Sequence, residues 1–288
     1  MARSEIDPRQ RRGFQLEMFG RLFHYSHALE TRFFQLFELS LLRREGVDFG
    51  SHFGKRVWKN PAQTEDWVNL ARFLRPSEAV FLLDIGANVG NFTSEFLAIY
   101  KNSRSVCFEP VRSTHAQLAE RFAKDPRVET HRCAVSDFDG KAEMHLEEDS
   151  TLCSLAEYTE DANAAYRTET VRLEQIECRR LDSFPYRRGA ELLFVKIDVQ
   201  GFEIEAIRGA MQTLAGADAV QLECSFADEY KGKEPSFSLA CALLRECNLY
   251  PIVFQDFGRL LSNYAFERDV LFVKRELLAK IWIRSQAS

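Results

Sequence analysis

Four acidic residues are candidates for binding a polar ligand or reacting with it. Asp84, Glu109, Asp198 and Glu223 each come at the end of an apolar run that has the composition of a buried strand. The carboxyl ends of parallel strands meet at one edge of a sheet, which is where such folds bind ligands. Carboxylates gathered there can orient hydroxyl or ammonium groups and accept a proton. The sequence therefore predicts a site at this edge.

A glycine-marked turn follows the first of these runs. The segment F-L-L-D-I-G-A-N-V-G-N, residues 81–91, is typical of a buried strand that turns sharply into a helix running to about Tyr100. Glycines let the backbone approach a ligand closely, and the first turn of a helix offers free N–H groups and a positive dipole end. We expect ligand contacts from Gly86, Ala87, Asn88, Gly90 and Asn91.

The neighbours of the turn indicate which ligand it binds. Dinucleotide enzymes carry G-x-G-x-x-G, whereas this chain has G-A-N-V-G with Asp84 two residues before it. An acid repels a phosphate group but attracts an ammonium, and S-adenosylmethionine carries one. Glu109, at the end of the next strand-like run, can accept hydrogen bonds from a ribose diol. Together these residues predict S-adenosylmethionine as the cofactor, against the alternative of an ordinary turn beside a solvated acid.

Four motifs in order resemble one known family. They are D-I-G-A-N-V-G at 84–90, F-E-P at 108–110, A-V-S-D-F-D-G at 134–140 and K-I-D-V-Q-G-F-E at 196–203. This arrangement resembles the FkbM family of S-adenosylmethionine-dependent O-methyltransferases over about residues 80–275. The resemblance implies a class I methyltransferase, an α/β Rossmann-like sheet of seven mostly parallel strands with the last strand antiparallel. It adds Pro110 to the expected cofactor contacts and implies as acceptor a sugar, a glycan or glycolipid intermediate, or a natural product.

Two positions depart from related methyltransferases. Asn88 stands where most of them have glycine, and asparagine tolerates a positive φ better than most residues. Ala134 fills the place where many of them have an acid that holds the adenine amino group. We therefore expect Ser136, Asp137 or the backbone to make that contact.

The reacting centre is predicted at Asp198, at the end of the fourth core strand. Methyl transfer is an in-line displacement that depends mainly on positioning, to which a base adds rate. Asp198 can orient the ammonium, steer the acceptor hydroxyl or act as the base; alternatively it caps the helix beginning near Phe202. Glu203 has the same two interpretations: it either caps that helix or contributes to the site. Gln200 replaces a glutamate that is frequent in the family pattern.

Glu223 is expected on the neighbouring strand end, where it lines the acceptor pocket as a second catalytic candidate. Asp198 and Glu223 together could hold Mg²⁺, which prefers oxygen ligands. This spacing alone does not establish a metal site, so no metal ligand is assigned.

The chain divides into an expected helical extension at residues 1–75 and a methyltransferase domain at residues 76–288. We expect strands at about 80–84, 104–108, 128–135, 192–198, 218–223, 250–254 and 269–274, and helices at about 91–100, 112–123, 202–214 and 236–247. An insertion at about 138–190 contains two extended pieces and, as a long loop at the ligand-binding edge, is expected to influence specificity.

Phenylalanine and leucine recur at three- and four-residue steps in the extension, between residues 13 and 44. This face predicts packing on the catalytic domain or homodimerisation through a second copy of the chain. A lid over the acceptor or a docking surface for a lipid-linked acceptor are the alternatives. Thr64 caps an expected helix before the first strand, where a contact with the cofactor is the second interpretation.

Bulk properties exclude several classes of function. The net charge is −5, and the region after residue 75 holds 25 basic and 34 acidic groups, which disfavours a nucleic-acid partner. Seven cysteines without a C-x-x-C motif indicate neither a disulfide framework nor a zinc site, so we expect a cytoplasmic protein. We expect no signal peptide and no membrane span.

Two other functions remain open at this point. An NAD-type Rossmann oxidoreductase would share the strand-turn-helix arrangement, although Asp84 and the missing second glycine disfavour it. A non-catalytic interaction protein could retain the fold and use the phenylalanine-rich helix as its binding surface. The acids at positions 84, 109 and 198 disfavour that interpretation.

Overall fold

The computed structural model describes residues 78–147, 149–160, 162–163, 170–186, 189, 191–226, 230–254 and 267–277. All of them belong to one unit of the chain, which spans residues 60–288. The predicted extension at 1–75, with its phenylalanine-rich helix and Thr64, lies outside the described residues.

A seven-stranded sheet organises this unit, in the order β3-β2-β1-β7-β8-β10-β9. The first five strands in that order are parallel, and β10 runs antiparallel to both β8 and β9. This confirms the predicted class I methyltransferase topology with its antiparallel last strand. The strands are β1 (Val80–Ile85), β2 (Arg104–Phe108), β3 (Val128–His131), β7 (Leu192–Ile197), β8 (Ala219–Ser225), β9 (Leu249–Phe254) and β10 (Glu267–Lys274).

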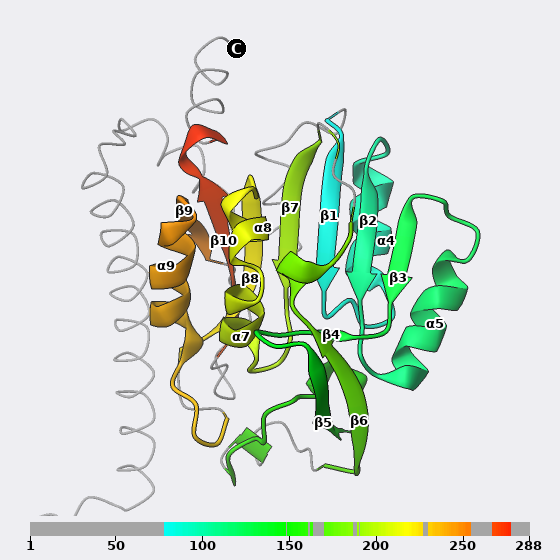
Figure 1. Cartoon of the computed structure of the whole chain (residues 1–288), viewed down its shortest axis with the longest axis vertical. Coiled ribbons are helices and arrows are strands. Elements are labelled where there is room, and N and C mark those ends of the chain that lie inside the picture. The colour runs from blue at the N-terminus through cyan, green and yellow to red at the C-terminus, as the bar shows by residue number, and fades with distance from the viewer. Residues whose placement is uncertain are drawn as a thin grey trace, which may run out of the picture. The chain divides into compact units, whose positions relative to one another are not determined.

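Helices cover both faces of this sheet. In Figure 1, α7 and α8 lie in front of the strands and α4 lies behind them. Every residue of β1 is buried, as expected for a central strand with helices on both sides. The helices are α4 (Asn91–Ile99), α5 (Arg112–Phe122), α7 (Glu203–Arg208), α8 (Met211–Ala215) and α9 (Ser236–Glu246).

The insertion supplies two strands to a second, three-stranded sheet in the order β4-β6-β5, in which β4 (Ala134–Val135) precedes the insertion. Strands β5 (Gly140–Leu146) and β6 (Arg172–Arg179) pair antiparallel, as the two predicted extended pieces. Figure 1 shows this sheet beyond the carboxyl ends of β1, β2 and β7. The insertion therefore stands at the edge where ligands bind in such folds.

Two predicted elements are wrong in their continuity. The strand expected at 128–135 ends at His131, and Ala134–Val135 forms β4, which leaves the main sheet to pair with β6. The helix expected at 202–214 breaks around Gly209. A Cβ on Gly209 would lie 1.8 Å from the carbonyl oxygen of Ser136, so the helix meets the strand exit too closely for a side chain.

Candidate active site

A cavity of about 630 Å³ opens at the carboxyl ends of the parallel strands. This volume lies in the usual range for a small-molecule site. Three groups of residues line it. They are the β1–α4 turn with Glu109 and Pro110; an apolar group comprising Val111, Cys133, Ala134, Val135 and Met144; and a polar group comprising Lys196, Asp198, Gln200, Gln221, Glu223 and Asp269.

The β1–α4 turn needs glycine for two separate reasons. Gly86 has a φ of +77°, and a Cβ there would lie 1.8 Å from the backbone oxygen of Asp198. Gly90 has a φ of +81° and packs against Leu118 and Phe122 of α5, which a Cβ would strike. Asn88 also has a positive φ, +49°, as its position in the motif predicts. The backbone therefore passes close to the strand ends and turns directly into α4.

Glu109 is held by the same turn from the end of β2. Its Oε2 accepts a hydrogen bond from the Asn88 N–H at 3.0 Å, and its Oε1 accepts one from the Val111 N–H at 2.9 Å. The side chain is largely buried yet lines the cavity. Burial raises the pKa of Glu109 to about 7, although both N–H groups favour the ionised form.

Asp84 lies beneath the cavity and is not part of its lining, so its predicted contact with a ligand ammonium stays a prediction. The side chain is fully buried, and its Oδ2 accepts a hydrogen bond from Thr93 Oγ1 at 2.6 Å. Its Oδ1 lies 3.7 Å from Lys196 Nζ. Burial raises the pKa of Asp84, and the Lys196 ammonium opposes that rise. In this arrangement Asp84 helps to hold Lys196 in place.

Lys196 connects the buried acid to the cavity. Its Nζ lies 3.0 Å from Asp198 Oδ2 and donates to the backbone oxygen of Gly86 at 3.1 Å. Burial alone would lower the pKa of Lys196, but Asp198 and Asp84 hold it above its ordinary value. The lysine is therefore a fixed cation between two carboxylates, and it also ties β7 to the turn after β1.

Asp198 and Glu223 meet at the polar group of the cavity, as the sequence predicted. A side-chain hydrogen bond joins the two carboxyl groups, and Gln200 Nε2 donates to both of them, to Asp198 Oδ1 at 3.0 Å and to Glu223 Oε2 at 2.6 Å. Burial alone would raise the pKa of Asp198, but Lys196, Gln200 and the hydrogen bond with Glu223 hold it below its ordinary value. Asp198 is consequently ionised near neutral pH and directed towards the cavity.

Gly86, Ala87, Asn88, Asn91, Glu109 and Pro110 line the cavity, whereas three predicted cofactor contacts besides Asp84 do not. Gly90 is the N-cap of α4, just behind the turn. Ser136 is fully buried, and its backbone N–H donates to Arg179. Asp137 is exposed outside the cavity. These two side chains therefore do not reach the cavity, and Ala134 and Val135 line it instead.

Glu203 caps the turn that leads into α7. Its Oε1 accepts hydrogen bonds from the N–H groups of Val199, at 3.3 Å, and Gly201, at 3.0 Å. Burial raises the pKa of Glu203 to about 7. The side chain is buried and outside the cavity lining, so the capping interpretation describes its placement.

Several lining residues were missed from the sequence. Lys196 could have been found, because a lysine in the otherwise apolar strand LLFVKI needs a buried partner. Ser150 and Thr151 come from the insertion, and Gln221 and Asp269 from β8 and β10, where Gln221 Nε2 donates to Asp269 Oδ2 at 2.9 Å. No local pattern in the sequence identifies these four.

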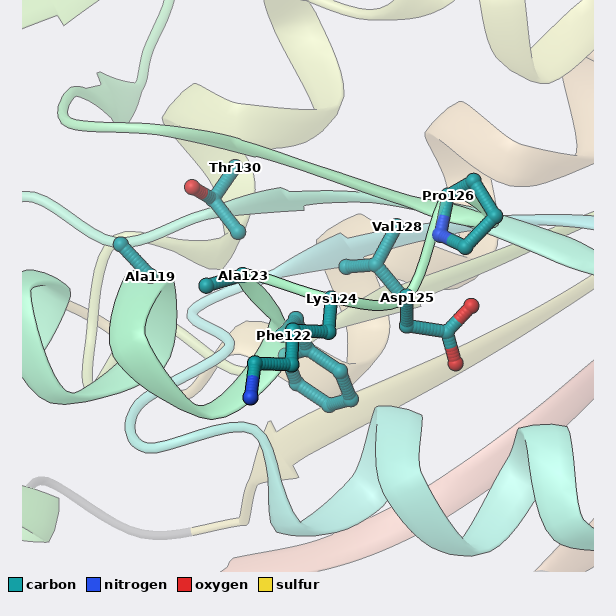
Figure 2. Close-up of a pocket in the computed structure, with 8 residues that line it drawn as sticks. All are labelled: Ala119, Phe122, Ala123, Lys124, Asp125, Pro126, Val128 and Thr130. Atoms are coloured by element: carbon teal, nitrogen blue, oxygen red, sulfur yellow. The ribbon is translucent and has the colours of Figure 1, made fainter.

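A second hollow, of about 540 Å³, lies at the end of α5 (Figure 2). Its lining runs from Ala119 through the turn at Pro126 to Thr130 on β3. The carboxylate of Asp125 is already paired with Arg127 at 2.7 Å. This hollow includes no residue from the carboxyl ends of β1, β7 or β8, so it offers none of the groups gathered in the larger cavity.

The sheet order and the strand-end cavity define the class I methyltransferase fold. Within it, residues 84–249 match the model of the methyltransferase FkbM domain. The chain belongs to the FkbM methyltransferase family and is an S-adenosylmethionine-dependent methyltransferase. This assignment displaces the oxidoreductase alternative.

The chain is also similar to individual proteins that are named as methyltransferases. The chain is 28% identical over 162 residues to the 2-O-methyltransferase NoeI of Sinorhizobium fredii, covering 54% of this chain and 67% of that protein. It is 16% identical to the crystal structure of methyltransferase FkbM from Methylobacillus flagellatus, with a TM-score of 0.44, covering 69% of this chain and 44% of that one. A precorrin-6y C5,15-methyltransferase from Geobacter metallireducens is 13% identical with a TM-score of 0.39, covering 72% and 86%. At these TM-scores neither structure bears on what this chain does.

Two further observations on the described residues concern membrane-spanning helices and cysteines. No described helix has both the length and the apolar character needed to cross a membrane. All seven cysteines lie in the described part of the chain, and each is free.

Proposed function

We propose that this chain transfers a methyl group from S-adenosylmethionine to a hydroxyl of a sugar or a sugar-containing small molecule. The observation that carries the proposal is the Asp198–Gln200–Glu223 group, which lines the same cavity as the glycine turn and Glu109. Carboxylates and amides side by side are suited to binding several hydroxyl groups at once.

The described residues fit the cofactor that the family requires. Glu109 lines the cavity with carboxylate lone pairs left over from its two N–H partners and would hold the ribose diol. The close backbone at Gly86 and the first turn of α4 would take the methionine part. The apolar group around Ala134 and Met144 would enclose the adenine. When bound, the cofactor supplies an electrophilic methyl group on a sulfonium.

Asp198 is the residue to which we assign the acceptor hydroxyl. Its ionised carboxylate accepts a hydrogen bond from that hydroxyl and fixes the direction of the oxygen. A carboxylate whose pKa is lowered is a weak base, so orientation is its first role and acceptance of the departing proton its second. Glu223, on the neighbouring strand, lines the acceptor side with it.

A sugar is the acceptor class that these groups support best. The polar group presents three carboxylates, Asp198, Glu223 and Asp269, with Lys196 as its cation. A polyanionic acceptor would be repelled there, whereas a neutral polyol satisfies carboxylates and amides with its hydroxyls. The relative named as a 2-O-methyltransferase supports a hydroxyl acceptor and suggests the 2-position.

The arrangement of the extension and the methyltransferase domain is also part of the proposal. The family match begins at residue 84, within the predicted methyltransferase domain of residues 76–288. We propose that the extension at 1–75 packs on that domain or on a second copy of the chain, in a cytoplasmic enzyme.

Asp198→Asn tests this assignment most directly. We expect the variant to bind S-adenosylmethionine within a few-fold of the parent chain, measured by calorimetry. Turnover, followed as S-adenosylhomocysteine release with a panel of methyl pyranosides and their 2-deoxy analogues, should fall about 10²- to 10⁴-fold. Asp125→Asn is the matched control, because Asp125 pairs with Arg127 far from the cavity. Unchanged turnover in Asp198→Asn would remove Asp198 from the reacting centre, and no methylation of any sugar would remove the acceptor class.

A further inference from the structure

Gln200 has a backbone conformation that is unusual for a residue other than glycine. Its φ is +51°, in the left-handed region that non-glycine residues rarely adopt. This conformation directs the amide nitrogen between Asp198 Oδ1, at 3.0 Å, and Glu223 Oε2, at 2.6 Å. An amide nitrogen carries two hydrogens, and each carboxylate takes one of them.

The orientation of that amide follows from its other contacts. Gln200 Oε1 accepts a hydrogen bond from the Tyr158 hydroxyl at 3.2 Å, and the backbone oxygen of Gln200 accepts one from Ser154 Oγ. Reversing the amide would place its oxygen against two carboxylates, which repel it. Both Tyr158 and Ser154 belong to the insertion, so the insertion holds Gln200 in place.

Two neighbouring carboxyl groups share a proton, as the hydrogen bond between Asp198 and Glu223 indicates, or take a donor or a positive group between them. Without one, their repulsion raises the pKa of at least one of the pair. A divalent cation is one such partner, and it takes several oxygen ligands. Gln200 supplies the donor as a neutral amide, while Lys196 engages the other oxygen of Asp198 at 3.0 Å.

We propose that Gln200 is a positioning residue that occupies the place of a bridging cation, and that by donating to both Asp198 and Glu223 it fixes this hydrogen-bonded pair so that Asp198 can orient the acceptor hydroxyl. This inference rests on the proposed role of Asp198. It means that the enzyme works without a divalent cation. It also means that a carboxylate at position 200 converts the group into three acids that bind one.

Gln200→Glu and Gln200→Ala test the proposal, with Gln175→Glu as the matched control. Gln175 is exposed on β6, so its substitution adds the same charge away from the cavity. Mn²⁺ is the probe, titrated by calorimetry into each full-length chain. We expect Gln200→Glu to bind Mn²⁺ at least about tenfold more tightly than the parent chain and Gln175→Glu to match the parent.

Carboxyl titration is the second measurement. With ¹³C-labelled side chains, the Asp198 signal, assigned through Asp198→Asn, should titrate at least one pH unit higher in Gln200→Glu and Gln200→Ala than in the parent chain. Both variants retain Lys196; Gln200→Ala reports on the loss of the amide donor, whereas Gln200→Glu adds the repulsion of a third carboxylate to that loss. The charged groups that also influence this region, and remain in every variant, are Asp84, Glu109, Lys196, Glu203, Glu223 and Asp269.

Turnover provides the third measurement and separates the two proposals. Parent turnover should be insensitive to EDTA, while Gln200→Glu should lose activity at least tenfold and recover part of it when Mg²⁺ is added. A merely structural role for Gln200 would not give recovery by a cation. If Gln200→Glu neither binds Mn²⁺ more tightly nor shifts the titration of Asp198, the bridging role is wrong. If Asp198→Asn alone leaves turnover unchanged, the proposed function fails instead.

Discussion

The two sides of the cavity are built by different means. On the β1–β2 side, backbone geometry dominates: positive φ angles at Gly86, Asn88 and Gly90 shape the turn, and two N–H groups fix Glu109. On the β7–β8 side, side chains hold one another: Lys196 and Gln200 each donate to Asp198.

This difference separates binding from reaction. A backbone-built side tolerates little change in residue size but depends weakly on charge elsewhere. A side-chain network keeps its shape only while all its members are present, because losing one leaves another with an unmatched charge. We therefore expect changes on the first side to act on cofactor binding and changes on the second to act on turnover.

Gly86→Ala should have the largest effect. The substitution combines a left-handed φ with a Cβ 1.8 Å from the Asp198 backbone oxygen, so we expect the free energy of unfolding to fall by about 2–4 kcal/mol. Urea denaturation measures this loss. Because relief of the clash must displace the turn, S-adenosylmethionine affinity should also fall at least about tenfold, measured by calorimetry.

Gly232→Ala is its matched control. Gly232 has a similar φ of +70°, but nothing lies within 4 Å of its missing Cβ. Its loss should be about 1 kcal/mol, which is the backbone term alone, with cofactor affinity unchanged. Equal losses in the two variants would show that close approach to Asp198 does not shape the turn.

The sequence was sufficient for the backbone-built side because its signals are local. The glycines, Asn88 and Glu109 fall within two strand ends, and their spacing predicts the turn that the structure contains. Asp84 is the exception. Its position in the motif was predicted correctly, but its direction depends on Thr93 in α4 and Lys196 in β7, which no local pattern supplies.

The next largest effect should be the pH dependence of ligand binding by Glu109. Its folded pKa of about 7 lies above its ordinary value, so the apo protein favours the protonated acid and loses stability as pH rises towards 7. A ribose diol donates to the ionised form. Affinity for 5′-methylthioadenosine, which has the ribose but no ammonium or carboxylate, should therefore be about tenfold higher at pH 8 than at pH 6.

Glu109→Gln is the variant that isolates this dependence. It should bind 5′-methylthioadenosine more weakly at pH 8 and with the same affinity at both pH values, because the amide does not titrate. Calorimetry at pH 6 and pH 8 measures both. A parent chain whose affinity stays flat across this range would contradict ribose binding by an ionised Glu109.

The side-chain network could be predicted only in part. Asp198 and Glu223 were placed correctly because strand ends are recognisable from apolar runs. The sequence marks Gln200 only as a departure from a family pattern, and its bridging geometry depends on Tyr158, 42 positions away. Contacts of this kind join segments with no shared periodicity, so the tertiary fold has to supply them.

Tyr158→Phe should have the smallest effect, and it tests how far the side-chain network around Asp198 extends. The change removes a hydroxyl that shares its hydrogen between Gln200 Oε1 and the Leu152 backbone oxygen, both at 3.2 Å, and keeps the ring that stacks on Tyr230. Losing one such bond costs about 0.5–1.5 kcal/mol, so we expect turnover to fall about 2- to 10-fold with cofactor affinity unchanged. Tyr186→Phe is the matched control, because its hydroxyl is bonded to Thr213 Oγ1 at 2.7 Å, outside the cavity lining. It should lose comparable stability and keep full turnover. If both variants lose turnover equally, the effect is one of stability, and the insertion does not act on the reacting centre through Gln200.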